Sequence, residues 1–164
     1  MSVVADLGLQ IKKVMSKNNK KFRKNIRLKN YDYKTNGAYF VTICTNFKRN
    51  YINKKERSII EQELMLLQKR FPGVIIDFYA IMPNHVHSII FLESSTISLS
   101  RIIQTFKSIT TLQLKKSGFN RRVFWQRNFY EHVIRNDEAL KNIREYVMNN
   151  PIAERINMEE IYGE

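Results

Sequence analysis

The sequence predicts an α+β fold in which helices cover a four-stranded antiparallel sheet. Four stretches rich in β-branched and aromatic residues indicate strands, and three stretches with apolar residues at helical spacing indicate helices. Their order is β-α-β-β-α-β followed by one further helix, which is the ferredoxin-like pattern. In that pattern two helices cover one face of the sheet, so the last helix and a ligand can use the other face.

The first half of the pattern begins after a turn at Asn36-Gly37, where the β-forming run 38–45 indicates a strand. Apolar residues at helical spacing follow until Pro72-Gly73 ends the helix. The run 74–81 indicates the second strand. A turn at Met82-Pro83-Asn84 then leads into the third strand, so these two strands are expected to form a hairpin.

Serine residues mark the start of the second half, because Ser98 or Ser100 can cap the next helix. The segment 121–135 then indicates a fourth, kinked strand. Asn136 is expected to cap the last helix, which carries acidic residues in its first turn and ends before Pro151. The element order of the ferredoxin-like pattern is then complete.

The chain divides into a basic arm at residues 1–30, a folded domain at residues 31–156 and a tail at residues 157–164. A single domain of this size buries about 70% of the surface of its unfolded chain. Cys44 is the only cysteine in the sequence, which excludes a disulfide within the chain and fits a reducing compartment. No apolar run approaches the ~18 residues of a membrane helix. We therefore expect a soluble, cytoplasmic protein.

Positive charge is the strongest global signal, because 28 lysine and arginine residues against 15 acidic residues give a net charge of +13. Nine of the basic residues fall between Lys12 and Lys29, with no acidic residue among them. Such a run can be a solvated arm, but it also suits a polyanion, since neutralising phosphates releases counterions. The segment lacks an amphipathic face with Trp or Leu anchors, which favours nucleic acid over a membrane surface.

Two of the three histidines stand two residues apart, at His85 and His87. Side chains alternate along a strand, so both rings are expected on one face of the sheet. Such a pair can bind a metal ion if a third ligand lies nearby, or it can be two half-buried polar residues with hydrogen-bond partners. On the last helix, Tyr146 and Asn150 are four residues apart and share a face. That tyrosine is either a residue at the edge of the core or a nucleophile beside a metal-bound phosphate.

Several separated motifs occur in the order found in one known family. They are Tyr31-Asp32-Tyr33, Gly37-Ala38-Tyr39-Phe40-Val41-Thr42, Met82-Pro83-Asn84-His85-Val86-His87, Phe106-Lys107-Ser108, Phe124-Trp125-Gln126-Arg127, His132-Val133-Ile134-Arg135 and Tyr146-Val147-Met148-Asn149-Asn150-Pro151. The chain resembles the IS200-like single-tyrosine (Y1) transposases of the HUH superfamily, and among them the REP-associated tyrosine transposases of bacteria. The resemblance covers roughly residues 26–156, so the folded domain is expected to be a Y1 transposase domain.

The resemblance implies a divalent metal ion, Mg²⁺ or Mn²⁺, held by His85 and His87. In the insertion-sequence members a glutamine four residues after the tyrosine completes the metal shell, and Asn150 stands at that position here. Because asparagine is one methylene shorter, His132 and Glu131 are alternative third ligands.

The resemblance also implies cleavage of single-stranded, hairpin-containing DNA through a 5′-phosphotyrosine, with later rejoining to another strand. Tyr146 matches the tyrosine of the family, and Tyr130 is its rival, because it lies beside Glu131 and His132. We favour Tyr146, since a helical tyrosine can approach the open sheet face, whereas residues next to Tyr130 on a strand point away from it. A monomer and a homodimer are both compatible with the resemblance.

Cations and hydroxyl groups in the arm, in the second helix and in the segment after it are expected to contact the DNA backbone. They are Lys21, Arg23, Lys24, Arg27, Lys107, Ser108, Arg121, Arg122 and Arg127. The alternative function is single-stranded nucleic-acid binding without catalysis on the same fold. Against an RNA-recognition sheet, His85 and His87 occupy the strand where stacking aromatic residues would be expected.

Overall fold

The computed structural model describes residues 36–149 of the chain. Its strands are β1 (Gly37–Cys44), β2 (Val74–Met82), β3 (His85–Leu92) and β4 (Tyr130–Ile134), and its helices are η1 (Asn46–Lys48), α2 (Lys54–Arg70), α3 (Leu99–Lys116) and α4 (Asp137–Asn149). Within the described residues the strands form one antiparallel sheet in the order β2-β3-β1-β4. This order is that of the ferredoxin-like pattern, so the predicted fold class is confirmed.

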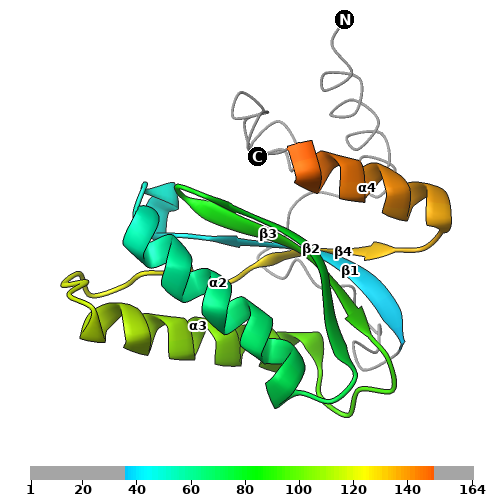
Figure 1. Ribbon diagram of the computed structural model, residues 1–164, viewed down its shortest axis with the longest axis horizontal. Coiled ribbons are helices and arrows are strands. Elements are labelled where there is room, and N and C mark those ends of the chain that lie inside the picture. Colours follow the sequence, from blue (N-terminus) through cyan, green and yellow to red (C-terminus); the bar gives the residue numbers. More distant parts are fainter. Residues whose placement is uncertain (1–35, 150–164) are drawn as a thin grey trace, which may run out of the picture.

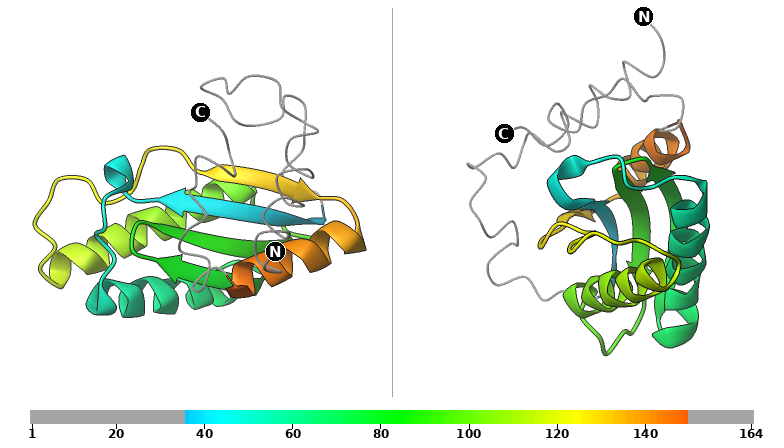
Figure 2. Two further views of the ribbon diagram at one scale, coloured as in Figure 1. Left: turned by 90° about the horizontal axis from the view of Figure 1, so that it is seen from above. Right: turned by 90° about the vertical axis from the view of Figure 1, so that its left-hand side faces the viewer.

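The sheet separates two layers of helices, with α2 and α3 on one face and α4 on the other (Figure 1). Alternation along β1 explains both layers: Tyr39 and Val41 pack with the core beneath α2 and α3, while Phe40 packs with the residues of α4. Because β1 is buried on both faces, it has the nearly continuous apolar sequence of a central strand. Figure 2 shows from two further sides that α4 lies against the sheet face opposite α2 and α3.

Polar side chains cap two of the helices as the sequence predicts. Ser98 Oγ accepts a hydrogen bond from the backbone N–H of Arg101 at the start of α3. Asn136 Oδ1 accepts one from the backbone N–H of Ala139, at 2.8 Å, at the start of α4. These bonds satisfy N–H groups that have no partner within the helix. In the described part of the chain, no helix is long and apolar enough to cross a membrane.

The fourth strand is shorter than predicted. Only Tyr130–Ile134 pair with β1, and Trp125 forms an isolated bridge with Thr45. The predicted fourth strand is thus confirmed at Tyr130–Ile134, but its extension toward residue 121 was wrong, because Phe124 and Trp125, although adjacent, are both buried in the core beneath α2 and α3. Neighbouring residues of a regular strand point to opposite faces, so this segment cannot be one.

Gly73, between α2 and β2, has a φ of +81°, and a Cβ atom there would lie 2.1 Å from the carbonyl oxygen of Glu93. We therefore expect Gly73→Ala to lower the free energy of unfolding by more than about 2 kcal/mol, as measured by urea unfolding. Gly118→Ala is the matched control, because Gly118 has a φ of +109° but nothing within 4 Å of the added atom. This control is expected to lose about 1 kcal/mol; equal losses in the two variants would contradict the steric argument.

Candidate metal and nucleophile site

Both histidines of β3 lie on the sheet face that α4 covers. The antiparallel register places Thr42 of β1 opposite His87 and Cys44 opposite His85. The centroids of the two imidazole rings are 4.6 Å apart, and both side chains are buried. The alternation of the strand therefore brings the two rings side by side.

A second side chain orients each imidazole. His85 Nδ1 lies 2.6 Å from Asn84 Oδ1, an amide oxygen, so this nitrogen carries the proton and donates. His87 Nδ1 lies 2.8 Å from the Thr42 hydroxyl oxygen, which can accept in the same way. In a ring whose Nδ1 carries the proton, the lone pair is on Nε2. Among the described residues, His87 Nε2 is buried and has no hydrogen-bond partner, which is what a metal-ligating nitrogen would show in a structure without ions.

Burial keeps both rings uncharged at neutral pH. It lowers the pKa of His85 to about 4, and the positive charge of Lys48 contributes to the shift. Burial, together with the neighbouring His85, holds the pKa of His87 well below its ordinary value. A neutral imidazole is the form that binds a metal ion, so no proton needs to leave these rings first.

Helix α4 carries Tyr146 to the histidines. Its ring centroid lies 5.6 Å from that of His87 and 6.1 Å from that of Phe40, and the residue is 3% exposed. Tyr146 belongs to the buried stripe of the helix together with Ala139, Ile143 and Val147. The packing of this stripe on the sheet therefore puts a phenol beside the imidazole of His87, which itself lies next to that of His85.

Tyr130 also lies on the histidine face, because it is paired with Thr42, the residue that contacts His87. Both tyrosines therefore lie on the same face of the sheet, while Glu131, the neighbour of Tyr130, points to the opposite face as strand alternation predicts. Burial raises the pKa of the Tyr130 phenol, and the nearby Cys44 adds to this effect. A higher pKa leaves less phenolate of Tyr130 at neutral pH.

The predicted alternatives for a third metal ligand lie in different places. His132 pairs with Phe40 and shares the histidine face, whereas Glu131 pairs with Val41 and lies on the face of α2 and α3. Among residues 36–149, no group of three or more His, Cys, Asp or Glu side chains could hold a metal ion. Asn150 lies outside the described residues, so its role as third ligand stays a prediction.

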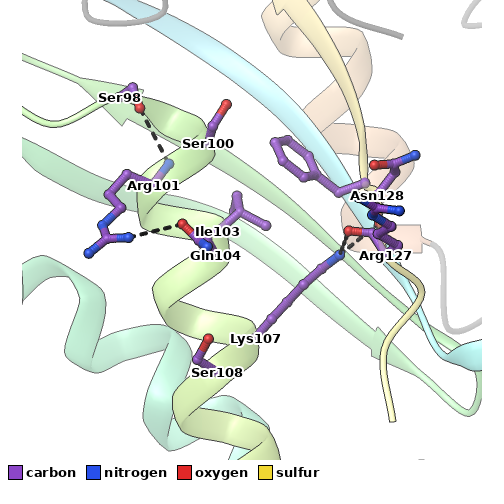
Figure 3. Close-up of a pocket in the computed structure, with 10 residues that line it drawn as sticks. Ser98, Ser100, Arg101, Ile103, Gln104, Lys107, Ser108, Arg127 and Asn128 are labelled. Atoms are coloured by element: carbon purple, nitrogen blue, oxygen red, sulfur yellow. Dashed lines mark hydrogen bonds between the residues drawn. The ribbon is translucent and has the colours of Figure 1, made fainter. Parts of the chain in front are cut away.

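Several predicted DNA-contacting residues gather at a pocket beside α3. Lys107, Ser108 and Arg127 line it, together with Arg101 and Ser100, and its volume is about 530 Å³ (Figure 3). The ammonium group of Lys107 donates to the backbone carbonyls of Gln126 and Asn128, each at 2.7 Å. Lys107 therefore anchors the segment that carries Arg127, a structural role that its charge did not predict.

The other predicted DNA contacts are dispersed. The guanidinium of Arg121 lies 5.6 Å from the ring centroid of Tyr51, and Arg122 is exposed. Lys21, Arg23, Lys24 and Arg27 lie outside the described residues. Sequence reasoning did not identify Arg101, although it is a cation on the same helix as Lys107, or the orienting roles of Thr42 and Asn84.

Comparisons with known protein sequences agree on one family. The sequence model of the family described as "Transposase IS200 like" matches residues 33–150. A Haemophilus influenzae protein of uncharacterized function is 33% identical over 162 residues, with 79% of this chain and 88% of the relative covered. A second H. influenzae protein, provisionally named a REP-associated tyrosine transposase, is 30% identical over 135 residues, with 74% of this chain and 73% of the relative covered.

Solved structures share the fold. The structure of a REP-associated tyrosine transposase bound to a REP hairpin superposes with a TM-score of 0.64 at 20% identity, covering 83% of this chain and 74% of that chain. A provisionally identified transposase from Deinococcus radiodurans superposes with a TM-score of 0.54 at 13% identity, covering 80% of this chain and 97% of that chain. At these identities the likeness concerns the fold alone.

The buried histidines predict that the metal-free protein loses stability in mild acid. Their folded-state pKa values lie below the ordinary value of 6.5, so the unfolded chain binds more protons below that pH. The free energy of unfolding should then fall as the pH falls through 6.5 toward 4, by about 2 kcal/mol near pH 5 for a pKa shift like that of His85. Urea unfolding with a chelator present measures this slope.

The control for this experiment is His85→Gln, which removes one of the titrating rings and should make the pH dependence shallower. His132, whose pKa is lowered by burial and by Arg135, contributes to the slope that remains. A wild-type protein that is equally stable at neutral pH and near pH 5 would contradict the burial of neutral imidazoles.

Proposed function

This chain belongs to the family of IS200-like transposases, and we propose that it cleaves and rejoins single-stranded DNA that contains a hairpin. The observation that carries the proposal is the Tyr146 ring beside His87, with 5.6 Å between the two ring centroids, next to the paired ring of His85. A phenol beside a pair of neutral imidazoles is suited to metal-assisted nucleophilic attack on a phosphodiester. The net charge of +13 suits a polyanionic substrate.

We assign His85 and His87 as ligands of a divalent ion, Mg²⁺ or Mn²⁺. The partnerless, buried Nε2 of His87 and the oriented Nδ1 atoms of both rings support this fit. Asn150 would add an amide oxygen, a ligand type that Mg²⁺ and Mn²⁺ accept. When bound, such an ion supplies Lewis-acid polarisation of the scissile phosphate.

Tyr146 acts as the nucleophile in this proposal. Its phenolate oxygen forms a bond to phosphorus in line with the departing 3′ oxygen, which leaves and takes up a proton as the 3′-OH. The 5′-phosphotyrosine ester retains the energy of the phosphodiester, so a 3′-OH of another strand can reverse the step and complete rejoining. Because Tyr146 is 3% exposed, the scissile phosphate has to enter between α4 and the sheet.

The DNA is expected to extend from the histidine face over basic surfaces. The relative that was solved with a REP hairpin supports a hairpin substrate for this chain. The pocket beside α3 supplies Arg101, Arg127 and the hydroxyl groups of Ser100 and Ser108, a combination that suits phosphate oxygens. The basic N-terminal arm would add further phosphate contacts.

Non-catalytic binding of single-stranded DNA is the second candidate function. Two observations favour it: the burial of Tyr146, and the lack of a three-ligand cluster of His, Cys, Asp or Glu among residues 36–149. A protein of this kind would bind hairpins without needing a metal ion. A single covalent assay distinguishes the two candidates.

The assay incubates the full chain with labelled single-stranded hairpin oligonucleotides and Mn²⁺ or Mg²⁺, and scores protein–DNA adducts that survive denaturation. We expect an adduct with the wild type and with Tyr130→Phe, and none with Tyr146→Phe, because only the Tyr146 phenol attacks. Loss in Tyr130→Phe alone would move the nucleophile to β4. Tight hairpin binding without any adduct, and without a metal requirement, would establish the non-catalytic function instead.

The hydrogen bond between His87 and Thr42 gives a prediction about metal affinity. Thr42→Val keeps the shape of the side chain but removes the oxygen 2.8 Å from His87 Nδ1, so the ring loses its orienting partner. Titration calorimetry with Mn²⁺ should show binding weakened by about tenfold or more. Thr110→Val is the control, since its hydroxyl bonds Trp125 on the other side of the sheet; weakening to the same extent there would point to a general loss of structure.

A further inference from the structure

An ion pair joins the helix of the proposed nucleophile to the outer strand β2. Arg144 Nε donates to Asp77 Oδ2 at 2.7 Å, and Arg144 Nη2 donates to Asp77 Oδ1 at 3.0 Å. The two parallel bonds hold the planar guanidinium in one orientation against the carboxylate. Arg144 precedes Tyr146 by two residues on α4.

Asp77 faces α4 because its neighbour Ile76 packs into the core on the opposite face, and an irregularity in the strand places Phe78 on the α4 face beside it. The pairing of β2 with β3 shifts between Ile76, which is opposite Ile90, and Phe78, which is opposite Ile89. One extra residue in β2 therefore lets Asp77 and Phe78 both point toward α4, although neighbours on a regular strand point to opposite faces. The ring of Phe78 also contacts the guanidinium of Arg144, at 5.6 Å from its centroid.

Arg144 and Tyr146 contact strands on opposite sides of β3. Arg144 binds β2, whereas Tyr146 packs on Phe40 of β1 and on His87 of β3 itself. In the sheet, β3 lies between β2 and β1. Rotation of α4 about its own axis would therefore break the ion pair and displace the tyrosine from the histidines together.

We infer that Asp77 and Arg144 are positioning residues that fix the rotation of α4 and hold Tyr146 beside His85 and His87. The inference rests on the proposed function, since it assigns the pair a role in presenting the nucleophile. Both side chains are partly exposed, with 37% of Arg144 and 19% of Asp77 accessible. Such a pair contributes little to global stability, so its effect should lie in the geometry of the helix.

The test is a double-mutant cycle with Asp77→Asn, Arg144→Gln and the double variant. The rate of adduct formation is measured in a single turnover at saturating hairpin DNA and Mn²⁺. We expect each single variant to be slower by about tenfold, because a small displacement of the nucleophile is costly. The double variant should be no slower than the slower single variant, because both changes break the same contact. Arg144→Lys should not restore the rate, since lysine lacks the planar fork.

Two variants distinguish a role in positioning Tyr146 from an electrostatic effect of the ion pair on DNA binding. Asp77→Asn removes a negative charge and cannot weaken DNA binding by charge, yet it should slow the reaction. Lys141→Gln is the matched control, because it removes a positive charge from an exposed position on the same helix and should react at the wild-type rate. Wild-type rates in Asp77→Asn, or single effects that multiply in the double variant, would overturn the inference.

Amide hydrogen exchange tests the same inference without relying on DNA cleavage. In Asp77→Asn, amides of α4 should exchange about tenfold faster, whereas those of α2 and α3 should keep their wild-type protection. Unchanged exchange in α4, or equal increases in all three helices, would overturn the positioning role. If the wild type forms no adduct, the proposed function fails, and the exchange measurement still decides whether Asp77 holds the helix.

Discussion

The antiparallel pairing of β1 with β3 is the interaction on which the candidate site depends. It sets Thr42 opposite His87 and Cys44 opposite His85 in the middle of a sheet that is covered on both faces. A shift of one residue in this register would turn both histidines into the opposite core. The same pairing thus brings Thr42 to His87 and buries both rings, and this burial lowers their pKa values.

Helix α4 converts this polar pair into a candidate catalytic centre. The helix packs on the sheet through a short buried stripe that includes Tyr146. The tyrosine therefore belongs to the packing that holds the helix in place and also to the proposed chemistry. An ion pair at the edge of the helix, such as that between Arg144 and Asp77, contributes little to the free energy of unfolding. In our proposal its role is to orient the helix that carries Tyr146.

Positive charge serves more than one purpose in this chain. Lys107 looks like a phosphate contact in the sequence, but its ammonium group binds main-chain carbonyls and anchors the segment before β4. Arg144 is engaged with Asp77. The arginines that line the pocket beside α3 are better placed to meet a DNA backbone. Net charge therefore predicts a polyanionic partner, while the contacts of each cation decide which of them is free to meet the proposed DNA.

Local patterns in the sequence determined the order of the helices and strands and the placement of both histidine rings on one face of the sheet. Periodicity, the Pro72-Gly73 stop and the caps Ser98 and Asn136 act over a few residues, so the element order could be predicted and is confirmed. The spacing of His85 and His87 placed both rings on one face for the same reason.

Only the tertiary structure decided which side chains surround those rings. Thr42 is 45 residues from His87, and Arg144 is 67 residues from Asp77, so no local pattern joins the members of either pair. The short fourth strand, the face of Tyr130 and the irregularity at Asp77 likewise follow from pairing and packing between distant segments. Short-range sequence preferences select the elements, whereas register and burial, which are non-local, select the neighbours of each functional group.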